Sequence, residues 1–290
     1  MLAVDVGGTK LAVATVRDDG VVLERYDTPT PAHADAATMW STVVGLIDRL
    51  DHGSDATAVG CGCGGPMTRG GDTVSPLNIP AWRDFTLRAH LAQHTGLPTF
   101  VDNDAKALAL GEGTFGAARG VENFIGMVVS TGIGGGIVLD GRLLDGAAGN
   151  AGHIGHVIVE PDGRMCACGA RGCVEAEASG TAIAAITGHP ASQADDAMRV
   201  RAGTLVGRAI ANVATLLDLQ LAVVAGSVAL GYGQTFFAAA QREIDARCGL
   251  GFARGTRVIA GALGTDGPIV GAACVAWANM RQKPLWEPGN

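Results

Sequence analysis

A histidine and three cysteines in one glycine-rich stretch could bind a metal ion. Cys166, Cys168 and Cys173 fall within eight residues, and His156 lies ten positions before the first of them. Thiolates and an imidazole suit Zn²⁺ in a closed tetrahedral site, and such a site stabilises a loop that has few apolar anchors. The pattern therefore favours a structural zinc loop. Three buried free cysteines, or a disulfide with one odd thiol, are the alternatives.

A second group of polar residues lies where a strand is expected to end. Residues 99–101 form a short apolar run, and Asp102-Asn103-Asp104 follows directly before a helix expected over about 105–118. Such a position at the carboxyl end of a strand is well placed for catalysis. Asp104 could serve only to cap the helix, but the triplet offers more carboxylate and amide groups than a cap requires. We therefore expect a functional role.

Two glycine-rich turns suggest sites for phosphate. Gly7-Gly8-Thr9-Lys10 follows the apolar run 2–6, and Ser130-Thr131-Gly132-Ile133-Gly134-Gly135-Gly136 follows the apolar run 123–129. Backbone N–H groups of such turns form anion-binding nests, and Asp5 could orient Mg²⁺ through water. The Gly-x4-Gly-Lys-Ser/Thr pattern of a Walker loop is absent. A plain β-turn is the alternative for the first of the two turns.

Composition narrows the class of protein. The chain has 290 residues, 48% of them hydrophobic, and a net charge of −7 with a pI near 5.4. An acidic chain with only 4% aromatic residues has few of the features of a nucleic-acid-binding surface. The first residues do not form a signal peptide, and no apolar window of about eighteen residues suggests a membrane span. We expect a cytoplasmic protein with no nucleic-acid or membrane partner.

The spacing of apolar residues predicts alternating strands and helices, which indicates an α/β class. The chain should begin with three antiparallel strands, the last two joined through Asp18-Asp19-Gly20. Cys61 and Cys63 have the spacing of core residues in a strand. Further helices are expected over 35–51, 85–94 with Asp84 as the N-cap, 181–187, 201–217, 232–246 and 267–281, and further strands over 58–63, 221–225 and 258–260.

The repeated strand–turn–strand arrangement suggests two similar halves, with a boundary near 103–122. We expect an N-terminal domain over 1–115, which carries the first turn and Asp104. A C-terminal domain over 116–275 should carry the second turn and the zinc loop. The last helix, within 267–290, could pack back on the first domain.

Together these motifs resemble the ROK family (repressors, open reading frames and sugar kinases), from residue 2 to about residue 274. The resemblance implies the actin/hexokinase-type ATPase fold, in which two ribonuclease-H-like domains around a cleft close over ATP and a sugar. It also implies a homodimer or a higher homo-oligomer. The motifs that carry it are Asp5-x-Gly-Gly-Thr-Lys10, Asn103-Asp104, Ser130-Thr-Gly-x-Gly-Gly-Gly136, Gly155-His156-x9-Cys-x-Cys-Gly-x2-Gly-Cys-x-Glu175 and Ala225-Gly-Ser227.

The resemblance also implies roles for individual residues. Asp104 corresponds to the general base that takes a proton from the sugar hydroxyl, and Asn103 to a sugar ligand. Glu175 and His156 match sugar-binding residues, and His156 also matches a ligand of the structural Zn²⁺, together with the three cysteines. The groups implied for ATP and its Mg²⁺ are Asp5, Gly7, Gly8, Thr9 and Lys10 in the first turn, Thr131, Gly132 and Gly134 in the second, and Gly226 and Ser227 in the adenosine-side turn.

His153 departs from the pattern of many glucokinase-like members, which have Glu at this position. A neutral imidazole can donate as well as accept a hydrogen bond, whereas a carboxylate only accepts. His at this position resembles the N-acetylmannosamine kinase branch, and a donor suits an acetamido carbonyl. We therefore expect phosphorylation of N-acetylmannosamine, with glucose as the alternative. Position 6 as the phosphorylated hydroxyl is implied by the family alone.

Three other interpretations concern the class of protein. ROK repressors carry a winged helix-turn-helix before the kinase-like body, whereas this chain begins on the first strand, and its acidic charge opposes DNA binding. A sugar sensor without turnover would have no need of Asp104 and both phosphate turns. Polyphosphate could replace ATP as the donor, but no basic strip for a polyanion is visible in the sequence.

Overall fold

The computed structural model describes residues 1–51 and 55–281 and divides the chain into two compact units. The chain passes from one unit to the other at 120/121, 141/142, 151/152 and 262/263, so neither unit is one continuous stretch. The part of the expected last helix beyond residue 281 lies outside the described residues. The first unit contains Met1–Gly120, Arg142–Ala151 and the described chain from Leu263 onward, and the second contains Val121–Gly141 and Gly152–Ala262.

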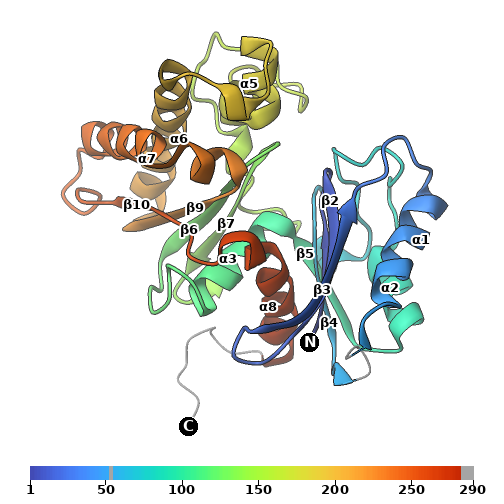
Figure 1. Ribbon diagram of the computed structural model, residues 1–290. Helices are drawn as coiled ribbons and strands as arrows, with labels where there is room; N and C mark the ends of the chain where they lie inside the picture. The colour runs from blue at the N-terminus through green and yellow to red at the C-terminus, as the bar shows by residue number, and fades with distance from the viewer. Residues whose placement is uncertain (52–54, 282–290) are drawn as a thin grey trace. The chain divides into compact units, whose positions relative to one another are not determined.

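The first unit is built on a mixed five-stranded sheet (Figure 1). Its strands are β1 (Leu2–Val6), β2 (Lys10–Val16), β3 (Val22–Pro29), β4 (Val59–Cys63) and β5 (Thr99–Asn103). Their order is β3-β2-β1-β4-β5, with β1, β2 and β3 antiparallel and β1, β4 and β5 parallel. The three antiparallel strands expected at the start of the chain are confirmed.

Alternate residues of this sheet face different pairs of helices. Helices α1 (Ala36–Ile47) and α2 (Leu87–Thr95) cover one face, and α3 (Asp104–Thr114) and α8 (Gly267–Arg281) cover the other (Figure 1). In β1, Val4 packs with α1 and α2, whereas Ala3 packs with α3 and α8. This period of two is that of a strand buried on both faces.

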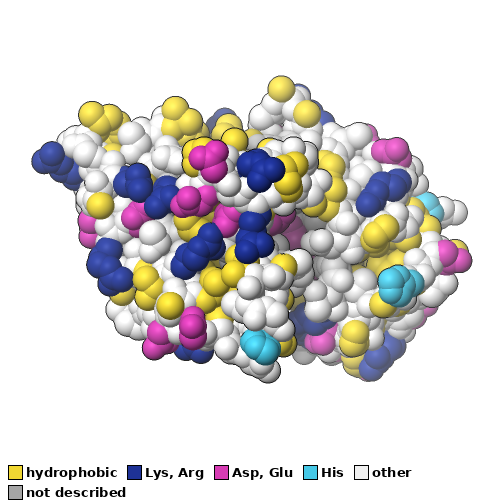
Figure 2. Space-filling view, turned by 90° about the horizontal axis from the view of Figure 1, so that it is seen from above, with side chains coloured by type: hydrophobic (Ala, Val, Ile, Leu, Met, Phe, Trp, Pro, Cys, Tyr) yellow, Lys and Arg dark blue, Asp and Glu magenta, His cyan; other side chains and the backbone are white. Residues whose placement is uncertain are grey.

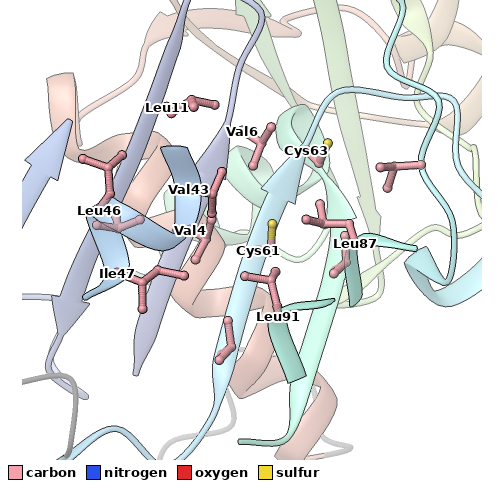
Figure 3. Close-up of a cluster of buried hydrophobic side chains, with 14 of the residues drawn as sticks. Val4, Val6, Leu11, Val43, Leu46, Ile47, Cys61, Cys63, Leu87 and Leu91 are labelled. Carbon is pink, nitrogen blue, oxygen red and sulfur yellow. The ribbon is translucent and has the colours of Figure 1, made fainter. Parts of the chain in front are cut away.

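The core between the sheet and α1 and α2 contains the two cysteines of β4. Figure 3 shows Cys61 and Cys63 pointing toward the same cluster as Val43 of α1 and Leu91 of α2. Both cysteines are fully buried, and burial raises the pKa of each thiol well above its usual range. The expectation that they belong to the core is confirmed.

The second unit contains a sheet with a similar order of connections. Strands β6 (Phe124–Val129) and β7 (Ile133–Leu139) form an antiparallel hairpin, and β9 (Leu221–Ala225) and β10 (Arg257–Ala260) follow parallel to β6, in the order β10-β9-β6-β7. The short β8 (Arg142–Leu143) belongs to a segment of the first unit. The helices of this unit are α4 (Val174–Ala178), α5 (Gly180–Thr187), α6 (Asp196–Leu217) and α7 (Ser227–Arg247).

Several helix starts differ from those expected. Asp84 is not the N-cap of α2, because the helix begins at Leu87 after Thr86, and the Asp84 amide instead donates to the Ser75 hydroxyl at 2.9 Å. Helix α6 begins earlier than expected because the Asp195 carboxylate caps it. Helix α7 begins directly after β9 and contains a non-helical residue, Gly233.

The surface mixes charges of both signs. Figure 2 shows Lys and Arg side chains close to Asp and Glu side chains on the visible face, with apolar atoms between them. Among the described residues, no helix has both the length and the apolar character needed to cross a membrane.

Candidate active site

Asp5 and Asp104 approach one another at the carboxyl edge of the first sheet. In the strand register Asp5 is opposite Gly62, on the face that α3 covers. A Cβ atom placed on Gly62 would lie 3.7 Å from Asp5 Oδ1 and 3.5 Å from Asp104 Cα. These are ordinary van der Waals distances, so Gly62, Asp5 and Asp104 are neighbours at this edge.

The electrostatics of Asp5 fit a position beside a cation. Burial, and secondly the charge of Asp104, raise the pKa of Asp5 to about 7, although Lys10 and Arg25 oppose this shift. A carboxyl group with such a pKa is only partly ionised at neutral pH. A divalent cation nearby would favour its charged form, and carboxylate oxygens are the ligands that Mg²⁺ prefers.

Asn103 and Asp104 have different positions at the start of α3. The side-chain oxygen of Asn103 caps the helix, accepting hydrogen bonds from the amides of Ala105 at 3.0 Å and Lys106 at 3.4 Å. Asp104 is the first helical residue, and its Oδ1 also accepts from the Ala105 amide at 2.8 Å. The cap is therefore Asn103 rather than Asp104.

Hydrogen bonds to both backbone polar groups of Gly7 fix the first glycine turn. The Gly7 amide donates to the Lys10 carbonyl at 3.0 Å, and the Thr30 hydroxyl donates to the Gly7 carbonyl at 2.7 Å. A Cβ atom on Gly8 would lie 2.5 Å from the Cβ of Asn78, so only glycine fits there. The sequence did not single out Asn78, although a polar residue between Pro76 and Pro80 was a usable signal.

In the second unit, the turn between β6 and β7 lies beside two other predicted groups. The Ser130 amide donates to the Gly132 carbonyl at 2.9 Å, which closes the turn. The Ser130 and Ser227 hydroxyl oxygens are 2.9 Å apart. The Glu175 Oε2 atom accepts from the Ile133 amide at 2.8 Å. The second phosphate turn, the adenosine-side turn and the predicted sugar carboxylate are therefore neighbours.

Gly226 occupies a position that only glycine can adopt without strain. Its φ angle is 99°, and a Cβ atom on it would lie 2.4 Å from the Val129 carbonyl oxygen. The residue joins β9 to α7, so Ser227 stands at the first position of a helix.

His153 precedes a short 3₁₀ turn, Ile154–His156, that ends at His156 and packs against β7. Their rings are nearly parallel, with centroids 6.2 Å apart and an angle of 23° between the planes. The same region carries Glu175 at the start of α4. Two imidazoles and one carboxylate can together donate and accept hydrogen bonds, as binding of a sugar requires.

The metal-ligating atoms of His156, Cys166, Cys168 and Cys173 all lie within 4.8 Å of one another. The Cys168 and Cys173 sulfurs are 3.7 Å apart, and His156 Nδ1 is 3.6 Å from the Cys166 sulfur. A tetrahedron with metal–sulfur bonds of about 2.3 Å has edges of about 3.8 Å. The four side chains therefore match a tetrahedral zinc site in composition and spacing.

Backbone hydrogen bonds shape the loop that carries the cysteines. The Cys166 amide donates to the Ala170 carbonyl at 2.8 Å, and the Gly169 amide donates to the Cys166 carbonyl at 2.9 Å. A hydrogen bond from the Ala170 amide lowers the pKa of the Cys168 thiol, whereas burial raises the pKa of Cys173 to about 12. A metal ion would favour the thiolate form of all three.

The structure brings the predicted residues together in two groups, one in each unit. The first unit holds Asp5, Gly7, Gly8, Thr9, Lys10, Asn103 and Asp104. The second unit holds Thr131, Gly132, Gly134, His153, His156, Cys166, Cys168, Cys173, Glu175, Gly226 and Ser227. The sequence alone did not indicate a role for Lys106, a buried lysine close to the first group.

Lys106 joins α3 to the segment Arg142–Ala151, which we call the strap. Its ammonium group lies 2.9 Å from Asp102 Oδ1, 2.9 Å from Asp145 Oδ1 and 3.2 Å from the Gly149 carbonyl oxygen. Only 1% of the residue is exposed. A lysine is buried this completely only when it is paired, as it is here.

Comparisons with known proteins agree with these motifs. The model of the ROK family matches residues 1–279. The chain is 39% identical to an N-acetylmannosamine kinase from Citrobacter koseri, over 80% of this chain and 84% of that protein. It is 33% identical to a glucokinase from Halalkalibacterium halodurans, over 100% of this chain and 97% of that protein.

A solved structure gives the same result for the fold. A ROK family glucokinase from Streptomyces griseus, in complex with glucose and AMPPNP, superposes with a TM-score of 0.83. Its sequence is 30% identical, and the match covers 98% of this chain and 99% of that one. This chain therefore belongs to the ROK family.

Proposed function

We propose that this chain is a sugar kinase that transfers the terminal phosphoryl group of ATP to a hexose or an N-acylhexosamine, at the 6-hydroxyl group. The preferred substrate is N-acetylmannosamine, with glucose as the alternative. The observation that carries the proposal is the placement of Asp104 at the first position of α3, beside Asp5 and close to Gly62. Relatives named for both sugars support it.

In this reaction Asp104 accepts the proton of the sugar hydroxyl group. The hydroxyl oxygen forms a bond to the terminal phosphorus atom while the bond from that phosphorus to ADP breaks. The base needs correct geometry and only an ordinary carboxylate pKa. Because its oxygen caps α3, Asn103 would offer its amide N–H group to the sugar.

The nucleotide would be held by backbone amides of both units. The turn at 7–10 and the turn at 130–132 would bind its phosphates, and Ser227 would lie on the adenosine side. Magnesium supplies neutralisation of phosphate charge when it is bound with ATP. Asp5 would hold that cation, which agrees with its raised pKa. We propose that the two units are the two ribonuclease-H-like domains around a cleft.

The sugar would meet His153, His156 and Glu175 in the second unit. Glu175 uses Oε2 to hold the Ile133 amide, so its other oxygen is the one to accept from a sugar hydroxyl. A His153 N–H group can donate to the carbonyl oxygen of an acetamido group, which a glutamate at this position could not do. This difference is the reason for placing N-acetylmannosamine before glucose.

The cysteine loop would hold a structural zinc through His156 and the three cysteines. Zinc there supplies folding energy to the loop and fixes the ring of His156. It would therefore link the stability of the loop to binding of the sugar. The homodimer implied by the family resemblance stays a prediction, which light scattering of the purified protein tests.

Replacement of the base tests the proposal. ADP release is measured with Mg-ATP and a panel of glucose, mannose, N-acetylglucosamine and N-acetylmannosamine. Asp104→Asn should lower kcat by about 10²–10⁴-fold, the usual contribution of a general base. The matched control is Asp196→Asn, because the Asp196 side chain is 85% exposed in the second unit.

The outcomes separate the alternatives. Equal rates for Asp104→Asn and the wild type would refute the role of Asp104. Sugar binding without turnover of any sugar would favour a sensor. Turnover with polyphosphate in place of ATP would identify a different donor.

A further inference from the structure

A cavity of about 410 Å³ lies inside the first unit, and none of its lining residues is among those assigned to sugar and nucleotide. It is bounded by β5, α3, the end of α8, the strap and the loop 67–70. Phe100, Leu110 and Leu143 form its apolar wall. A volume of this size is typical of sites for small molecules and too small for a polymer.

Some of the charged side chains that line this cavity form ion pairs with other residues, and some do not. Arg69, Arg88, Arg142 and Lys106 line it together with Asp102 and Asp145, so cations exceed anions by 4 − 2 = 2. The two carboxylates share the buried Lys106 ammonium. Arg88 pairs with Asp72, which is not a lining residue.

Arg69 and Arg142 are the groups left for a ligand. Both are exposed, and in the described parts of the chain neither guanidinium group forms a hydrogen bond or an ion pair with another residue. A guanidinium group presents paired N–H donors whose geometry matches a carboxylate or a phosphate. Two such groups at one small cavity, with no acidic partner, are suited to a small anion.

We propose that this cavity binds a small acidic metabolite, whose phosphate or carboxylate group is held by Arg69 and Arg142, and that its binding fixes the strap. Arg142 belongs to the strap and Arg69 to the loop 67–70, which is already tied to the strap by a hydrogen bond from the Asn150 amide group to the Met67 carbonyl at 2.9 Å. An anion bound by both arginines would add a second connection between the strap and the loop 67–70.

The strap gives such a ligand a route to the catalytic residues. Lys106 connects the strap to α3, whose first residue is Asp104. At its other end the strap continues directly into the segment that carries His153. An occupied cavity would therefore restrict both the start of α3 and the backbone before His153. Binding of the anion and its effect on the strap do not depend on which reaction the chain catalyses, whereas the effect on catalysis rests on the proposed function.

Titration calorimetry with inorganic phosphate and, separately, with succinate tests the proposal. Both titrations are done at constant ionic strength with Mg²⁺ and AMPPNP present, so that the proposed nucleotide turns are filled. We expect saturable binding of at least one probe, and the double variant Arg69→Gln with Arg142→Gln should raise its Kd by about tenfold or more. Binding of phosphate alone or succinate alone identifies the acidic group.

The matched control is the double variant Arg242→Gln with Arg257→Gln. Both of these arginines are exposed in the second unit and, in the described chain, their side chains have no hydrogen bond or ion pair. The control should leave Kd unchanged, because it removes the same net charge elsewhere. Hydrogen exchange of amides 142–151 should become slower when the probe binds to the wild type.

Three results would overturn the proposal. They are a lack of saturable binding of either probe to the wild type, an equal Kd in the wild type and the cavity variant, and an equal rise of Kd in both double variants. A cavity variant with an altered oligomeric state and an unaltered Kd would instead make this face an interface between copies.

Discussion

Replacement of the buried Lys106 should destabilise the first unit strongly. The variant Lys106→Met keeps an unbranched side chain that is one heavy atom shorter, and it removes three contacts, to Asp102, Asp145 and the Gly149 carbonyl. The Asp145 side chain is 54% exposed and can be hydrated, whereas that of Asp102 is 18% exposed and would lose its ion pair. Loss of one partner of a buried pair costs about 3–5 kcal/mol. We expect about 3 kcal/mol, because the Asn103 amide still donates to Asp102 at 2.7 Å.

The loss should depend on pH through Asp102. Burial raises the pKa of this carboxyl group, and Lys106 lowers it in part. Without Lys106 the pKa in the folded state rises further above that of the unfolded state, so the folded state binds more protons. The free energy of unfolding then falls as the pH rises. The deficit of Lys106→Met relative to the wild type should be larger at pH 8 than at pH 5.

Urea unfolding followed by tryptophan fluorescence measures the stability of the first unit, because Trp40, Trp82 and Trp277 all belong to it. The combined variant Asp102→Asn with Lys106→Met removes both charges and should be more stable than the sum of the single losses predicts, by about 1–3 kcal/mol. The reasoning would be refuted if Lys106→Met lowered the free energy of unfolding by less than about 1 kcal/mol at pH 8. It would also be refuted if the loss in the double variant equalled the sum of the losses in the two single variants.

Three further predictions concern the second unit. Removal by a chelator of the zinc that we propose should lower the melting temperature and raise KM for the sugar, because the proposed roles place His156 at both the metal and the sugar; unchanged kinetics after verified removal would contradict the link. His153→Glu should shift the ratio of kcat/KM values toward glucose by about 10-fold or more, with His189→Glu as the exposed control, and an unchanged ratio would reject the selective role. Gly226→Ala should cost at least about 2 kcal/mol in thermal or urea unfolding, because of its φ of 99° and the nearby Val129 carbonyl, whereas Gly231→Ala in open space should be neutral or stabilising. Equal stability of the two alanine variants would contradict the described turn.

Much of the fold follows from local patterns in the chain. Runs of apolar residues placed all the strands except the two-residue β8, and the glycine turns after β1 and β6 were recognised because no apolar run continues through them. Asp84 was assigned wrongly as an N-cap because cap residues are common in all turns, and here the carboxylate lies outside the helix beside Ser75. Helix α4 has only five residues, too few for a helical period to show.

The two groups of candidate residues were harder to derive than the strands. The zinc ligands are visible because four residues of unusual chemistry lie close together in the chain. Lys106 was missed because its partner Asp145 is distant in sequence, and a lysine in a helix is ordinarily exposed. The pKa of Asp5 depends on burial and on Asp104, which are properties of the folded chain alone.

The place of α8 in the first sheet has a consequence for synthesis of the protein. The strands that it covers, among them β1 and β2, leave the ribosome first, whereas α8 is made almost last. Until then the face that carries Ala3, Ala12 and Ala14 lacks its cover, and the first unit cannot reach its final stability. The first strands of the nascent chain therefore cannot complete their packing until α8 has been made. A chain interrupted after α7 would leave this apolar face exposed, which favours aggregation.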